Sequence, residues 1–535
     1  MDRLTSLKKA IWIIGAFLAL YFLFCLRSIY DFGTSYLWCE DGMILYADAA
    51  KYGIESIFYE SNGSMWFIQR LLGWIVYSVT YSLNVLKLYP VIMSLITKFI
   101  EVACVFYFTS EKFSWIIESK WMRLFVSASV LVAIPDTGVD VVNCDTSAAF
   151  IYMFAVFLIG LNAFWPVEKL SVFEALFLVL MAISSLGAPF VFGVVILRLI
   201  SFIIYNKSSF GTSDNKKDLI VYIVEVALVI FAVFIQMFVL FTSERTSKTA
   251  LDLFDRLWAT FLHFIWFPYC NYYFVSIILT LVGVALWVVA TIITKSKPLA
   301  VLYGAGFSFV WLFICSLSCD YKVMFQPIFD INNRNLESRF WTLSYMIAAF
   351  YVGCAVYKLW KRNKGFKVVA VILLIAEIGM LSWHYRLVTN GKEELYIRAF
   401  DSNIVMCDTN GEEKLYIPIG PFEEPEPFGI YVPTKMDGRA LTDEDIQIIN
   451  KEAFLDKPRH IGLTTANTGG DQIKAAFLKY DDLDYYVGCY RSGMLEDING
   501  RRVERLEFMN TAKIRDKDAY QLYVLLESGK LVRVD

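Results

Sequence analysis

The stretch "KKAIWIIGAFLALYFLFCLRSIY", residues 8–30, decides the fold, because an uninterrupted apolar run is framed there by basic residues. A run of roughly 20 apolar residues is long enough to cross the ~30 Å hydrocarbon layer of a bilayer. Comparable runs recur as far as His384, whereas charges are frequent from Tyr385 to Asp535 and no run there is long enough to span. The sequence therefore predicts a membrane domain over 1–385 and a polar domain over 386–535.

The overall composition supports this division. The chain is 57% hydrophobic and only 19% charged, whereas soluble domains are about 25% charged. Three histidines and the lack of a CxxC spacing argue against a histidine metal centre, a His-based triad or a zinc site. Residues 386–535 hold 20 Lys and Arg against 27 Asp and Glu, so an acidic domain that binds no nucleic acid is expected.

Charge in the loops predicts the topology. We expect about 11 spans, at residues 9–29, 88–109, 121–136, 146–165, 169–186, 189–206, 218–242, 274–294, 299–318, 340–358 and 367–385. Counted from the basic N-terminus, alternate connections all carry Lys or Arg, and such loops remain in the cytoplasm. The other side then receives the longer loops 30–87, 136–145, 243–273 and 319–339. We therefore expect a multi-pass plasma-membrane protein with a cytoplasmic N-terminus and an extracytoplasmic C-terminal domain.

One apolar segment does not fit the count of spans. "MWFIQRLLGWIVYSV", residues 65–79, contains Arg70, and treating it as a span would invert every later loop. An amphipathic helix lying on the outer leaflet is the better interpretation. Trp66 and Trp74 would then lie at headgroup level, with Arg70 pointing to water or phosphate.

A pair of acidic residues follows the first span. In "SYLWCEDGMILYADAAKYG", residues 35–53, Glu40 and Asp41 precede a short predicted helix over 42–52 that Gly53 would terminate. Free N–H groups and the helix dipole stabilise negative charge at such a position. Taken alone, the pair is more typical of an ordinary N-cap than of a reactive site.

The order of motifs around this pair resembles that of GT-C-type glycosyltransferases, particularly bacterial enzymes that modify cell-surface polysaccharide. "WCEDG" and "QRLLGWI" are similar to the family's first outer loop, and "IPDTGVDVVNCDTSAAF" (134–150) is similar to its second. Further similarities are a Gly and Pro break in "SSLGAPFVFGVVILRL" (184–199), a Gln followed by an outer Arg in "AVFIQMFVLFTSER" (232–245), and "ESRFWTLS" (337–344) opening a late span. The resemblance covers roughly residues 10–385. It implies a GT-C-like, polytopic α-helical membrane protein that takes a sugar from a polyprenyl-phosphate carrier.

That chemistry assigns roles to the outer-loop residues. A carboxylate must deprotonate the acceptor hydroxyl, and Asp41, or alternatively Glu40, would supply it. Cations must stabilise the departing phosphate, a role that suits Arg339 and, after it, Arg334 and Arg245. Acceptor or sugar binding is expected of Asn143, Asp145 and Arg70. A single displacement by this route inverts the anomeric configuration.

The sequence requires no cofactor. Glu40, Asp41 and Asp145 offer oxygen ligands that would suit a divalent cation, but the arginines would supply the same charge without a metal. The expected partners are a polyprenyl-phosphate sugar, a glycan or lipid-linked acceptor, and the surrounding membrane lipids. Within the spans, Lys98 and Glu101 would pair with each other, while Glu225 and Gln236 would line the bundle interior or join helices.

The pattern of the C-terminal part predicts an α+β or mostly β domain. "KLYIPIG" (414–420) and "FGIYV" (428–432) are typical of strands, and "LTDEDIQIINKEAF" (441–454) is typical of a helix. "YQLYVLLESGKLVRV" (520–534) predicts a hairpin that turns at Ser528–Gly529.

Three other functions compete with a sugar transferase. A flippase would carry charges along several spans, often in internal repeats, and no repeat is visible. A polysaccharide polymerase would also use outer-face arginines and a polyprenyl substrate, so the acidic pair is the discriminating feature. A receptor with an outer sensing domain would need no carboxylates opposite arginines.

Overall fold

The computed structural model describes most of the helical part of the chain and a set of strands beyond residue 404. The described residues are 2–26, 37–38, 41–61, 64–83, 85, 88–134, 145–165, 171–184, 187–206, 213–242, 253–257, 260, 298–318, 342–375, 405–409, 412–420, 428–433, 447–448, 459–464, 473–480, 486–498, 501–508, 520–526 and 531–534.

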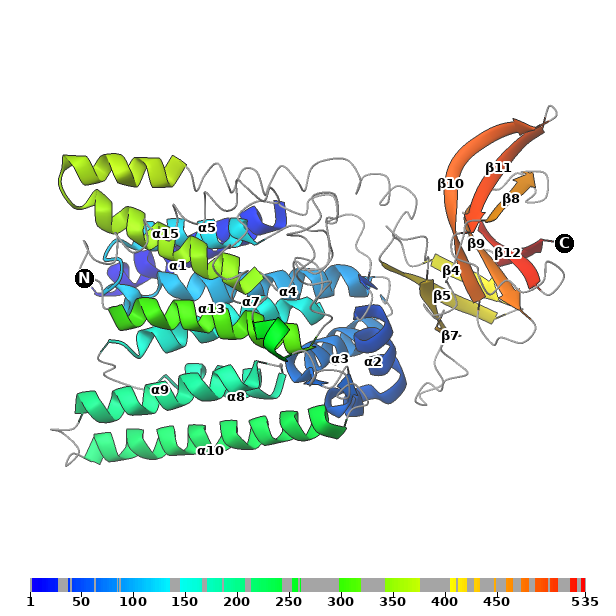
Figure 1. Ribbon diagram of the computed structural model, residues 1–535. Coiled ribbons are helices and arrows are strands. Elements are labelled where there is room, and N and C mark those ends of the chain that lie inside the picture. The colour runs from blue at the N-terminus through cyan, green and yellow to red at the C-terminus, as the bar shows by residue number, and fades with distance from the viewer. Residues whose placement is uncertain are drawn as a thin grey trace.

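The long helices lie side by side in one bundle (Figure 1). They are α1 (Asp2–Leu26), α4 (Tyr89–Phe106), α5 (Lys120–Ala133), α7 (Asp145–Asn162), α8 (Val172–Ser184), α9 (Ala188–Asn206), α10 (Ser213–Thr242), α13 (Pro298–Ser318) and α15 (Thr342–Trp360). Among the described residues, six helices are long and apolar enough to cross a membrane, and two shorter helices are apolar. The predicted polytopic helical architecture is confirmed. The expected span 274–294 lies outside the described residues, and 367–385 is described only as far as 375.

The centre of the bundle is α7. Every side chain from Ile151 to Phe157 on this helix is at most 5% exposed. A helix that is apolar all round belongs in the interior, and α7 contacts α4, α9, α13 and α15. The interior packs through aromatic rings, among them Phe157 stacked on Tyr303 with centroids 5.5 Å apart.

The outermost face of α10 is apolar and exposed. Phe231, Phe234 and Phe238 are 61–67% exposed, while Val229 and Ala232 on the opposite face are fully buried. An apolar outer face beside a buried inner face is expected of a helix surrounded by hydrocarbon, where lipid tails replace water as the contact.

The loop between α1 and α4 folds into several short elements at one end of the bundle, which we call the acidic end. They are η2 (Asp41–Tyr46), α2 (Ala47–Tyr52), η3 (Gly53–Phe58), β2 (Glu60–Ser61), β3 (Ser64–Met65) and α3 (Phe67–Ser82). The helix α3 begins within the segment predicted to lie on the membrane surface, and it is not one of the six candidate spans. It buries Gln69, Arg70 and Thr80 and exposes Ile75 and Val79, so its polar side faces protein and its apolar side faces outward.

Basic connections gather at the opposite end, which we call the basic end. Lys120 lies over the ring of Trp12, 4.7 Å from its centroid, and Lys361 contacts Glu118 at 2.5 Å. The start of α1, the connection before α5 and the connection after α15 therefore meet, as the charge pattern predicts. That the basic end faces the cytoplasm stays a prediction.

All the described residues beyond 404 form strands. They are β4 (Val405–Thr409), β5 (Glu412–Gly420), β6 (Phe428–Pro433), β7 (Gln447–Ile448), β8 (Arg459–Thr464), β9 (Ile473–Tyr480), β10 (Tyr486–Ile498), β11 (Arg501–Phe508), β12 (Tyr520–Leu526) and β13 (Leu531–Val534). One sheet has the order β1-β5-β6-β7, where β1 is Leu37–Trp38, with β4 also on β5. The second sheet has the order β13-β12-β9-β10-β11-β8.

The expected strands over 414–420 and 428–432 are present, and β12 pairs with β13 as the predicted hairpin. The helix expected over 441–454 is wrong at Gln447 and Ile448. These residues pair with Tyr431 and Ile430 of β6, because an available strand partner outweighs local helical preference.

The acidic loop also contributes to the first sheet. Leu37 and Trp38, which form β1, pair in parallel with Ile419 and Gly420 of β5. The strand ahead of the acidic pair thus joins the bundle to the C-terminal part, at the end of the bundle where α2 and α3 lie (Figure 1).

Candidate functional site

Residues 41–53 form one continuous helical segment at the acidic end, which we call the acidic rod. It begins at Asp41 with a π-helical turn, continues as α2, and ends at Gly53. Gly53 has φ +56°, a conformation that glycine adopts at little cost, so the predicted C-cap is confirmed. Asp41 therefore lies at the N-terminus of a helical segment, as the sequence predicts.

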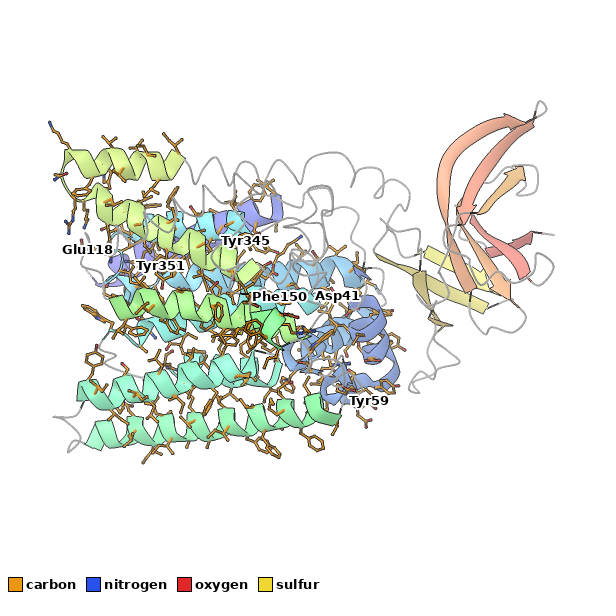
Figure 2. All side chains as sticks on the ribbon, viewed as in Figure 1. Asp41, Tyr59, Glu118, Phe150, Tyr345 and Tyr351 are labelled. Carbon is orange, nitrogen blue, oxygen red and sulfur yellow. The ribbon has the colours of Figure 1, made fainter. Side chains whose placement is uncertain are left out.

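Asp41 is buried, although an ordinary N-cap would face water. Its exposed fraction is 4%, and the same turn buries Leu45 and Tyr46 beneath it. Burying a carboxylate is costly unless polar groups or charges compensate. Figure 2 shows Asp41 and Tyr59 at one end of the bundle and Glu118 at the other. The burial of Asp41 weakens the interpretation of this residue as a simple surface cap.

Aromatic rings pack against the π-helical turn Asp41–Tyr46, which we call the acidic turn. The ring of Tyr46 makes edge contacts with Tyr77 of α3 and Tyr89 of α4, with centroids 5.4 and 4.8 Å apart. Burial raises the pKa of Tyr46 and of Tyr77; the phenol of Tyr77 adds to the increase at Tyr46, and that of Tyr81 adds to the increase at Tyr77. Both phenols therefore remain protonated at neutral pH, and neither is suited to act as a base beside Asp41.

Close approach of α3 to the turn depends on Gly73. A Cβ at this position would lie 3.2 Å from the Cβ of Leu45 and 3.3 Å from the hydroxyl of Tyr89. Such spacing leaves little room for a larger side chain, so a glycine allows the helix to lie directly against the acidic turn.

The expectation that Arg70 points to water or phosphate is wrong. Its side chain is 2% exposed, and Nη1 donates to Asp48 Oδ2 at 2.8 Å and to the carbonyl of Ser56 at 3.1 Å. Nη2 lies 3.5 Å from the carbonyl of Glu60. A carboxylate and two carbonyls inside the loop satisfy the guanidinium better than exposure would, so Arg70 joins α3 to α2, η3 and β2.

The other predicted site residues have little or no described geometry. Asp145 begins α7, and only its backbone is described. The remaining predicted residues lie outside the described residues: Glu40, Asn143, Arg245, Arg334 and Arg339. Their proximity to Asp41, and the oxygen-rich set that would suit a cation, stay predictions.

Two residues of the site were not predicted from the sequence. Asp48 is the counter-ion of Arg70. Gln69 is 1% exposed and has no hydrogen-bond partner for Oε1 within the described part of the chain. A polar Gln-Arg pair inside an otherwise apolar segment was the available signal for Gln69, whereas no local pattern connects Asp48 with Arg70.

A second charged cluster lies nearer the basic end of the bundle. Arg198 of α9 bridges two carboxylates, with Nη1 2.6 Å from Glu225 of α10 and Nη2 3.2 Å from Glu174 of α8. Glu174 also accepts from Lys112 and from the hydroxyl of Tyr107. The charges balance, so Glu225 joins helices as the sequence predicts. We call these five residues the ionic network.

Comparison of the chain with protein-family models, curated proteins and solved structures gave no match. Inference about function therefore depends on the chemistry of the acidic end.

Proposed function

We propose that the protein is a membrane glycosyltransferase. It moves a sugar from a polyprenyl-phosphate carrier to a cell-surface glycan or lipid-linked acceptor at the extracytoplasmic face of a bacterial plasma membrane. The observation that supports this most is the burial of Asp41 at the N-terminus of a helical rod, at one end of a membrane bundle. In the proposal, a carboxylate held there would lie close to the level of lipid headgroups, where a lipid-linked phosphate would present its sugar.

In the proposed reaction, Asp41 or Glu40 accepts the proton of the acceptor hydroxyl as that oxygen attacks the anomeric carbon. The bond from the anomeric carbon to the phosphate oxygen breaks, and the polyprenyl phosphate leaves with the electron pair. Arg339, Arg334 and Arg245 would stabilise its charge, since a guanidinium binds phosphate through two parallel hydrogen bonds.

Other residues have supporting roles in the proposal. Asn143 and Asp145 would bind the acceptor or the sugar. Arg70, which engages Asp48 instead of facing water, would act by holding the acidic rod in place. The C-terminal domain would be extracytoplasmic and, through the pairing of β1 with β5, would cover the strand that leads to Glu40.

The decisive experiment uses full-length protein in lipid nanodiscs with radiolabelled polyprenyl-phosphate sugars. Wild type is compared with Asp41→Asn, Glu40→Gln and Arg339→Ala, and Glu55→Gln, an exposed carboxylate of the same loop, is the matched control. We expect wild type and Glu55→Gln to transfer sugar and at least one carboxamide variant at 40 or 41 to be folded but inactive. Equal behaviour of all five proteins would refute the proposal, and retention of anomeric configuration would refute the single displacement.

The ionic network favours a flippase as the second candidate, because charges inside a bundle often mark a transport path. Its balanced, mutually paired charges argue for a structural role instead. Translocation of a lipid-linked sugar across reconstituted vesicles, lost in Arg198→Met but retained in Asp41→Asn, would favour the flippase.

A further inference from the structure

We infer that Gln236 is a positioning residue for the acidic rod. From α10, its carboxamide fixes the start of α3, and α3 in turn holds α2 through Arg70. The effect on sugar transfer rests on the proposed function, whereas the effect on the conformation of the rod does not.

Gln236 uses both ends of its amide on the first outer loop. Oε1 accepts from the backbone N–H of Met65 at 3.2 Å and from the hydroxyl of Ser64 at 3.4 Å. Nε2 donates to the carbonyl of Met65 at 3.0 Å and to the carbonyl of Ile183 in α8. Because the side chain is 5% exposed, few of these bonds can be replaced by water.

The chemistry of this contact requires a carboxamide. It pairs with the N–H and the C=O of Met65 at once, as a neighbouring strand would. A glutamate has no amide donor and would turn a charged oxygen toward the carbonyls of Met65 and Ile183. A methionine has similar length but would leave the backbone groups of Met65 unpaired in a buried place.

A second bond holds the same stretch of chain against α8. The N–H of Ile68 donates to the hydroxyl oxygen of Ser184 at 3.0 Å, and that hydroxyl donates to the carbonyl of Leu180 at 2.6 Å. The start of α3 is therefore fixed at Met65 and at Ile68, by the ends of α10 and α8 that lie at the acidic end.

The constraint continues to the carboxylate through described contacts. Arg70 lies in the first turn of α3 and holds Asp48, Ser56 and the carbonyl of Glu60. Asp48 belongs to the rod that begins at Asp41, so displacement of the start of α3 must move the rod or break the ion pair. A misplacement of about 1 Å can lower a reaction rate by roughly 100-fold.

The test compares Gln236→Met with a control that loses a buried bond elsewhere. Ser344→Ala is suitable, because Ser308 and Ser344 join α13 to α15 through a buried bond of 2.7 Å. Hydrogen exchange of backbone amides 41–61 in the full-length protein measures the conformation of the rod without any substrate. We expect Gln236→Met, but not Ser344→Ala, to accelerate exchange in this segment at least about tenfold.

Transfer kinetics supply the second measurement. If the rod carries the base, kcat should fall at least about tenfold in Gln236→Met, with KM for the lipid donor changed less than about twofold. Should Gln236→Met fail to fold, Ser184→Ala removes one bond of the same anchor and should give the same pattern with smaller size.

Equal exchange in the Gln236→Met and Ser344→Ala variants, or acceleration confined to α10, would overturn the positioning role. Acceleration over 41–61 in a protein whose wild type transfers no sugar would support the positioning role and count against the proposed function. The two failures are thus distinguishable.

Discussion

Arg70 and Asp48 form an ion pair of unequal burial: the arginine side chain is 2% exposed and the aspartate 24%, with Nη1 and Oδ2 2.8 Å apart. Because the arginine is the more buried partner, its guanidinium depends on the carboxylate for charge compensation more than the carboxylate depends on the guanidinium. The pair joins α2 to α3 directly after the acidic turn in the chain.

This asymmetry gives a first prediction. Asp48→Asn leaves a buried guanidinium without its counter-charge, and we expect a loss of about 3–5 kcal/mol in the free energy of unfolding. Arg70→Met leaves an aspartate that can reach water and should cost about 1–3 kcal/mol. Chemical unfolding in detergent measures both, and the double variant should lose less than the sum of the two. Strict additivity would show that the pair is not coupled.

The buried phenols of Tyr46 and Tyr77 give a prediction about the pH dependence of stability. The pKa of Tyr46 and of Tyr77 is raised on folding, so the native state retains these protons more tightly than the unfolded chain. Their contribution to stability is complete below the unfolded tyrosine pKa of about 10 and declines as the pH rises beyond it. Thermal unfolding of wild type should therefore show a falling Tm above about pH 10.

Tyr46→Phe is the matched variant for that experiment. The hydroxyl of Tyr46 is buried and has no hydrogen-bond partner among the described residues, so its removal should be neutral or stabilising at pH 7. The alkaline decline should also become smaller. A marked loss of stability at pH 7 would show that the hydroxyl makes an essential contact.

Two glycines of α13 give a packing prediction. The ring of Tyr351 occupies the place that a Cβ would take at Gly304, whereas nothing lies within 4 Å of a Cβ at Gly306. Gly304→Ala should therefore cost about 1–3 kcal/mol through overpacking. Gly306→Ala should be neutral or stabilise by up to about 1 kcal/mol, because alanine favours the helix. A similar Tm for the two variants would contradict the described contact.

The ionic network predicts a graded series. Arg198→Met leaves Glu174 and Glu225 buried without their shared cation and should destabilise by about 3–5 kcal/mol. Lys112→Met should cost less than about 1 kcal/mol, since the lysine side chain is 40% exposed and screened by water. Adding Glu174→Gln and Glu225→Gln to Arg198→Met should restore part of the stability. Failure to restore any would point to a role of the carboxylates beyond pairing.

The sequence was sufficient for the course of the helices but not for the contacts of polar residues. Length and hydropathy predict α1, α4, α9, α10 and α15 well, because a bilayer imposes the same requirement on every span. The presence of α3 outside the spans followed from a single arginine in an apolar segment. The direction of that arginine did not follow.

Tertiary pairing explains what the sequence could not predict. Asp48 lies 22 residues before Arg70 and Gln236 lies 171 residues after Met65, so no local pattern connects either pair. The burial of Asp41 likewise depends on packing of the turn against α3 and α4. An acidic residue before a helix has the same local sequence whether it faces water or is enclosed.

The bond between Met65 and Gln236 has a consequence for biosynthesis. The backbone groups of Met65 find their partner only after another 171 residues have been translated. At about 5–20 residues per second this takes on the order of ten to thirty seconds. Throughout that interval the backbone groups of Met65 must pair with other groups, and the start of α3 can reach its final position only after α10 has been made.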